Sequence, residues 1–135
     1  MSSENLWSGL KFNLAKTPVE ILTEQMQGLS DATKGKIKEK ITTTRVADEH
    51  NRVGFLCVAS FVAPALGNYV FDVVRIHYHL DKMYPVRIKY MIVEGRVITP
   101  ASNEDQLREK LKSLFTDGLT VGALSSLMAH IPSDK

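Results

Sequence analysis

Apolar and polar side chains alternate along the segment from Tyr69 to Ile92. Its two runs, YVFDVVRIHYHL and YPVRIKYMI, each predict a strand, because successive side chains of a strand point to opposite sheet faces. The polar pair Asp81-Lys82 between them predicts the turn of an antiparallel hairpin. One face would carry the core residues Val70, Val74, Ile76, Tyr78, Leu80, Tyr84, Val86, Ile88, Tyr90 and Ile92, and the other the basic residues Arg75, His77, His79, Arg87 and Lys89.

Further strands are predicted on both sides of this hairpin. Residues Lys36 to Val46 are β-branched and alternating, which favours an edge strand whose lysines block pairing with other sheets. Residues Val53 to Val62 are apolar on both faces and predict a central strand, in which small residues such as Gly54 allow close packing. A short fifth strand is expected at residues 96–99.

Three helices complete the predicted fold. The sequence Thr17-Pro18-Val19-Glu20 predicts a capping box that begins a helix ending near Ser30. Ser102 or Asn103 would cap a second helix that stops at Asp117-Gly118, and Thr120 would cap a third that Pro132 ends. We therefore predict an α+β fold with an N-terminal helix, a four- to five-stranded antiparallel sheet and two C-terminal helices packed on one sheet face. The domain would span residues 17–132, after an N-terminal arm of residues 1–16.

Composition agrees with a folded chain that needs no metal or disulfide. The chain has 135 residues, 44% of them hydrophobic and 24% charged. Its single cysteine, Cys57, lies within the apolar run FLCVASFV and is expected to be a core residue in a reducing compartment. Because no signal-peptide pattern and no apolar stretch of membrane-spanning length are found, we expect a cytoplasmic protein without membrane contact or cofactor.

Positive charge is concentrated in the middle of the chain. Ten Lys or Arg residues lie between Thr33 and Lys89, against five Asp or Glu residues. Such an asymmetry can steer an anionic partner, although a solvated sheet face protected by lysines would show the same pattern. The residues expected to meet phosphate groups are Lys36, Lys38, Lys40, Arg75, His77, Arg87 and Lys89.

The sheet face away from the helices is also predicted to carry apolar residues, namely Phe71, Val73, Met91 and Val93. A contiguous apolar patch is costly to leave in water, so we expect this face to form a homodimer or bind a partner protein. The chain is therefore interpreted as a non-catalytic binding or self-association module. Nucleic-acid or polyanion binding on the basic face is the alternative, although exposed aromatic residues for base stacking are few.

Catalysis is the least supported class, and an enzyme is not favoured. His77-Tyr78-His79 resembles the paired histidines of cupin metal sites, but the glycine and glutamate of that pattern are absent at the expected spacing. Nearby Arg75 would repel a cation, so no metal site is assigned. A small-ligand or metal-dependent enzyme that uses His77 and His79 is kept as the second alternative. Asp72 would point away from both histidines in a regular strand, and is expected to be buried and hydrogen-bonded to Tyr78, Arg45 or a backbone amide. No catalytic residue is assigned.

Overall fold

The N-terminal part of the protein is an extended arm followed by a short helical segment. The computed structural model describes residues 6–12 and 14–132, so residues 1–5 and 13 of the predicted arm lie outside the described part. Helix α1 (Pro18–Met26) begins at the predicted capping box, in which Thr17 Oγ1 accepts from the amide of Glu20 at 3.3 Å. Gly28, with φ of 88°, then separates α1 from α2 (Leu29–Ala32), so the single predicted helix is interrupted there.

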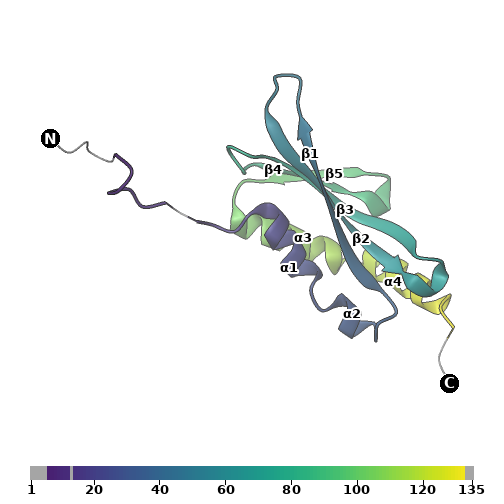
Figure 1. Cartoon of the computed structure of the whole chain (residues 1–135). Helices are drawn as coiled ribbons and strands as arrows, with labels where there is room; N and C mark the ends of the chain where they lie inside the picture. The colour runs from purple at the N-terminus through teal and green to yellow at the C-terminus, as the bar shows by residue number, and fades with distance from the viewer. Residues whose placement is uncertain (1–5, 13, 133–135) are drawn as a thin grey trace.

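Five strands form one antiparallel sheet in chain order (Figure 1). They are β1 (Lys38–Ala47), β2 (Val53–Ala63), β3 (Tyr69–His79), β4 (Val86–Tyr90) and β5 (Arg96–Ala101). Short 3₁₀ turns, η1 (Pro64–Leu66) and η2 (Met91–Val93), follow β2 and β4. Every neighbouring pair of strands is antiparallel, as the alternating pattern predicted.

Two helices follow the sheet, which confirms the predicted α+β fold. Helix α3 (Glu104–Phe115) is capped by Asn103, whose side chain accepts from the amide of Gln106 at 2.9 Å. Helix α4 (Gly118–Ala129) is capped by Asp117 rather than by Thr120, whose hydroxyl is instead 2.6 Å from both Tyr90 Oη and Leu114 O. No helix in residues 6–12 and 14–132 has the length and apolarity needed to cross a bilayer.

The core lies between the sheet and the helices. Cys57 is fully buried, as its position in an apolar run predicted, and burial raises the pKa of its thiol. The core-facing strand residues are Cys57, Ala59, Phe61, Val74, Ile76, Tyr78, Val86, Ile88 and Tyr90, and the helices add Ile21, Leu22, Met26, Leu107, Leu111 and Leu114. The opposite sheet face, here called the open face, is not covered by these helices (Figure 1).

A β-bulge changes the expected alternation within β3. Ala59 pairs with Val74 but Ser60 pairs with Asp72, which leaves Val73 as an extra residue between two ladder pairs. Asp72 is consequently exposed on the open face, where Ser60 Oγ donates to its Oδ1 at 2.8 Å. The prediction of a buried Asp72 facing away from the histidines is therefore wrong, because a bulge shifts the phase of the strand.

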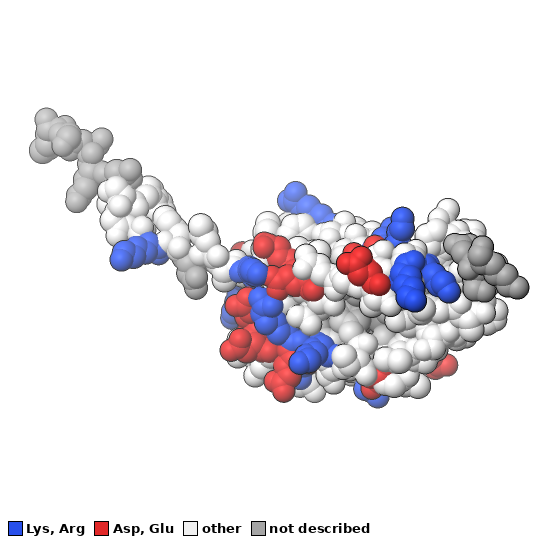
Figure 2. Space-filling model, turned by 90° about the horizontal axis from the view of Figure 1, so that it is seen from below, with Lys and Arg blue, Asp and Glu red and all other residues white. Residues whose placement is uncertain are grey.

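Charged residues join α1 to α3 at the root of the arm. Arg108 donates from Nη1 to Glu24 at 2.6 Å and from Nη2 to Glu104 at 3.0 Å, and Lys16 also pairs with Glu24. The bonds from Lys16 and then Arg108 lower the pKa of the Glu24 carboxyl. Seen from below, acidic and basic side chains gather at the end from which the arm leaves, while the middle of the surface is mostly uncharged (Figure 2).

Candidate anion-binding site

Four basic side chains face one another across the pairing of β3 with β4. His77 pairs with Arg87 and Arg75 pairs with Lys89, so each basic residue lies directly opposite another. Directly opposed like charges destabilise a sheet, because their Cβ atoms are only about 5 Å apart. This arrangement agrees with the predicted basic face, and an anion lying between the strands would relieve its repulsion.

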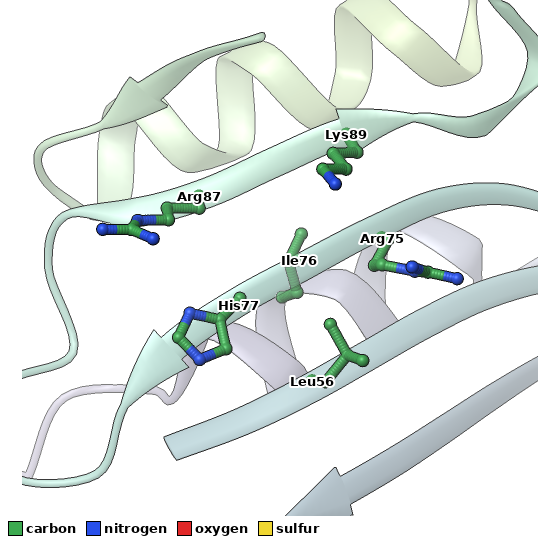
Figure 3. A pocket seen from close by; sticks show the side chains of 6 residues that line it. All are labelled: Leu56, Arg75, Ile76, His77, Arg87 and Lys89. Atoms are coloured by element: carbon green, nitrogen blue, oxygen red, sulfur yellow. The ribbon is translucent and has the colours of Figure 1, made fainter. Parts of the chain in front are cut away.

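These side chains line a hollow in the open face (Figure 3). Its volume is about 300 Å³, and the lining residues are Leu56, Arg75, Ile76, His77, Arg87 and Lys89. Figure 3 shows Arg87 and Lys89 extending from β4 and His77 and Arg75 from the neighbouring β3, with Ile76 between the latter two and Leu56 on β2 beyond them; the guanidinium of Arg75 is turned away from the other three. No carboxylate is among the lining residues, so the field in the hollow is positive.

A second hollow continues the first toward the turn between β3 and β4. It has a volume of about 190 Å³ and shares His77 and Arg87 with the first hollow. Its other lining residues are Arg52, His79, Lys82, Tyr84 and Pro85. Because they share two basic side chains, the two neighbouring hollows are here called the basic groove.

Two residues that line these hollows each have a buried polar side-chain atom without a hydrogen-bond partner. In residues 6–12 and 14–132, the buried side-chain atoms without such a partner are Arg75 Nε and Tyr84 Oη. Arg75 lines the first hollow and Tyr84 lines the second. Burial raises the pKa of the Tyr84 hydroxyl, and Glu104 and Arg108 of α3 also act on it, so Tyr84 Oη lies toward the helix side and Arg75 is the one of the two that belongs to the open face.

The cations of the first hollow are also free of ion pairs. Within the described residues, Arg75, Arg87 and Lys89 make no salt bridge. By contrast, Arg52 at the far end of the second hollow is 3.3 Å from Asp81. The positive charge of the first hollow is therefore not neutralised by the protein itself.

His77 is held in its neutral form by its surroundings. Its burial lowers its pKa below the ordinary value of 6.5, and the nearby charges of His79 and Arg87 lower it further, whereas Asp48 acts in the opposite direction. The rings of His77 and His79 meet edge to face, with centroids 5.3 Å apart, and His79 Nε2 is 3.5 Å from Asp48 Oδ2. Proton uptake by His77 would add a further positive charge to the groove.

The predicted lysine row is only partly confirmed by its placement. Lys40 pairs with Ser60 and Lys38 with Val62, which places both exposed lysines on the open face at the far edge of the sheet. Lys36 precedes β1 and lines another hollow with residues that include Ile131 and Pro132. Lys36 is therefore not part of the open face, because the strand begins two residues later than predicted.

The predicted apolar patch is not found on the open face. Val73, the bulged residue, is fully buried, and Phe71 pairs with the buried Phe61 on the helix side of the sheet. Met91 and Val93 belong to η2 and are half-buried. The predicted placement is wrong because regular alternation was assumed through a bulge and beyond the end of β4. Apolar residues of the open face include Leu56, Val58, Val62, Val70 and Val97. The predicted core position of Val70 is therefore wrong, because the bulge shifts the phase of β3 before Val74.

Metal ligation has little support from this geometry. In the part of the chain that the structure describes, no group of three or more His, Cys, Asp or Glu residues is placed to hold a metal ion. Asp72 bonds to Ser60 rather than to either histidine, and the carboxylate beside His79 is that of Asp48, which precedes β2. Comparisons with protein-family models, curated proteins and solved structures found no match for this chain. Functional inference therefore rests on the groove itself.

Proposed function

We propose that the open sheet face is a binding surface for a polyanion, with the phosphate backbone of a nucleic acid as the ligand class. The observation that carries the proposal is a hollow lined by four basic side chains and no carboxylate, in which Arg75, Arg87 and Lys89 make no salt bridge within the described residues. Arginine offers a planar fork of donors that matches phosphate oxygens, and a guanidinium left without a protein partner is suited to that contact.

The shape of the groove favours a ligand with several anionic groups. The two hollows share His77 and Arg87, so one phosphate held in each would be bridged by the same side chains. Lys38 and Lys40 add exposed charge at the opposite edge of the same face. A chain of phosphates can contact these positions in succession, whereas a small monoanion would use only one of them.

Recognition of bases is not part of the proposal. The strand positions of the open face carry no Phe, Tyr or Trp, and single-strand binders usually stack bases on such rings. Binding through phosphates alone is insensitive to sequence and depends strongly on salt. Five contacts from Arg75, Arg87, Lys89, Lys38 and Lys40 correspond to a slope of about −3.5 in log affinity against log salt for a single strand.

Charge reversal in β4 tests this function. Arg87→Glu combined with Lys89→Glu should weaken binding of a labelled single-stranded oligonucleotide, measured by fluorescence anisotropy, and should make the salt slope shallower by about 1.4. Lys110→Glu combined with Lys112→Glu in α3 makes the same charge change on the other side of the sheet and is the matched control. Equal affinity of the wild type and the β4 variant would contradict the proposal.

Self-association through the open face is the second candidate function. Leu56, Val58 and Val62 form a half-buried apolar row along β2, and Val70 beside Val62 is 43% exposed. An apolar interface is unaffected or strengthened by salts that weaken polyanion binding. Sedimentation at increasing salt, in parallel with the oligonucleotide titration, therefore separates the two candidates.

A further inference from the structure

A second hollow surface, on the helix side, is apolar and differs in character from the groove. It lies between the end of α1, α2 and α4, and its volume is about 240 Å³. The lining residues are Gln25, Met26, Gln27, Gly28, Leu29, Ala32, Phe61, Phe115 and Leu124. Pockets for small molecules usually measure about 300–1,000 Å³, so this hollow suits one or two inserted side chains better than a cofactor.

Helix α4, which forms one wall of the hollow, presents apolar residues to solvent. None of the residues from Gly118 to Ala129 is charged, yet only Thr120 is buried. Leu119 is 56% and Val121 49% exposed. Leu124, Leu127 and Met128 pack partly against the core, whereas Leu119 and Val121 do not, so the exposed apolar side chains of α4 indicate a surface that another element covers.

The N-terminal arm offers apolar side chains of the required kind. Leu6, Trp7, Leu10, Phe12 and Leu14 are all between 53% and 92% exposed. The arm runs away from the sheet and helices instead of lying on them (Figure 1). One chain therefore carries both an apolar hollow and an exposed apolar segment that does not occupy it.

We propose that the arm of one copy docks in the helix-side hollow and against α4 of a second copy, and that the exchange is reciprocal. The arm leaves from the N-terminal end of α1, whereas the hollow lies at the C-terminal end of that helix. The capping box at Thr17 and the pairing of Lys16 with Glu24 hold residues 16 and 17 against α1. Exchange of identical segments between two copies closes into a symmetric dimer, which satisfies both apolar surfaces at once.

This dimer is independent of the proposed polyanion site. The arm and the hollow lie on the helix side, so the basic groove on the open face stays accessible in both copies. Substitutions on the helix side and on the open face therefore test different statements. Failure of one does not imply failure of the other.

Trp7 provides a direct reporter, because it is the only tryptophan in the chain. The full-length protein should be a dimer by size-exclusion chromatography with light scattering. The emission of Trp7 in this dimer should be blue-shifted relative to that of a solvent-exposed tryptophan. On dilution, the emission should move to the red over the concentration range in which the mass falls to that of a monomer. Ala32→Glu, an exposed position in the hollow, and Phe12→Asp in the arm should each give a red-shifted monomer.

Ser113→Glu, at an exposed position of α3 outside the hollow, is the matched control and should remain a dimer. Circular dichroism spectra of all variants should coincide, because every substituted side chain is exposed. A monomer with red-shifted emission at all concentrations would overturn the proposal. So would a blue-shifted monomer, in which the arm folds onto its own hollow, and so would a dimer that survives Ala32→Glu.

Discussion

At the scale of single residues, the groove combines charge that the protein leaves unpaired with a histidine that it keeps neutral. Arg75 has a buried Nε without a partner, and His77 lies opposite Arg87. The alternating sequence correctly placed the four basic residues of the first hollow, because their segment of β3 and β4 is regular. It could not reveal the missing partner of Arg75 or the pKa of His77, since both depend on burial by residues distant in sequence.

The lowered pKa of His77 predicts a pH dependence of binding. At neutral pH this histidine is uncharged, and it gains a proton, which an anion in the groove would stabilise, only as pH falls through its lowered pKa, below 6.5. Oligonucleotide affinity should therefore rise as pH is lowered below 6.5, measured by anisotropy at constant ionic strength. His77→Gln should make the profile flatter than that of the wild type. A flat profile in the wild type would exclude a role for His77.

Without a ligand, the lowered pKa of His77 makes the folded protein less stable as pH falls, whereas ligand binding becomes stronger. A histidine whose pKa is lower in the folded than in the unfolded state binds fewer protons when folded. The free energy of unfolding therefore decreases as pH falls below the unfolded value of His77. A bound polyanion would offset this loss.

At the scale of secondary-structure elements, prediction succeeded where the alternation was regular and failed at breaks in the pattern. The capping box at Thr17 and the antiparallel strands were recognised because each has a local sequence signature. The bulge at Val73 has none, because the run of valines in YVFDVV is apolar on either phase. Its position is set by pairing with β2, so the faces of Phe71 and Asp72 could not be read from the strand alone.

Close contact between β2 and β3 predicts that Gly54 tolerates no side chain. A Cβ at this position would lie 2.4 Å from Tyr78 O and 3.3 Å from His77 Nε2. Gly54→Ala should therefore lower the free energy of unfolding by about 1–3 kcal/mol, measured by urea denaturation, because the strands must separate. It should also disturb the His77 side of the groove.

Gly122→Ala in α4 is the matched control. A Cβ there meets nothing within 4 Å, and alanine in a helix is favoured over glycine by about 0.5–1 kcal/mol. The two substitutions should thus have opposite signs. Equal stability of Gly54→Ala and the wild type would show that β2 and β3 are not packed as closely as described.

At the scale of the whole molecule, one core separates two surfaces of different chemistry. Figure 1 shows the helices on one side of the sheet, where the surface includes an apolar hollow, while the basic groove occupies the other side. Composition and hydrophobic pattern predicted this layering. They could not predict that Leu119 and Val121 of α4 remain exposed, because a helix without charged residues would ordinarily be expected to bury its large apolar side chains.

The core position of Cys57 predicts a thiol that reports global unfolding. It is fully buried, and burial raises its pKa, so reaction with a thiol reagent should require the core to open. Labelling in native buffer should be slow and should accelerate in urea over the same range as the loss of circular dichroism. An added thiol in Ser113→Cys should react at once, since that position is exposed. Rapid labelling of Cys57 in native buffer would contradict the packing of β2 against the helices.

The bulge at Val73 divides β3 into two segments whose side chains are oriented independently. The orientation of Tyr69–Asp72 is set by pairing with residues 60–63 of β2, and that of the residues from Val74 onward by pairing with both β2 and β4. A redesign of the Tyr69–Asp72 segment can thus exchange inward and outward positions without rotating Arg75 or His77. The two segments of this one strand can therefore be redesigned separately.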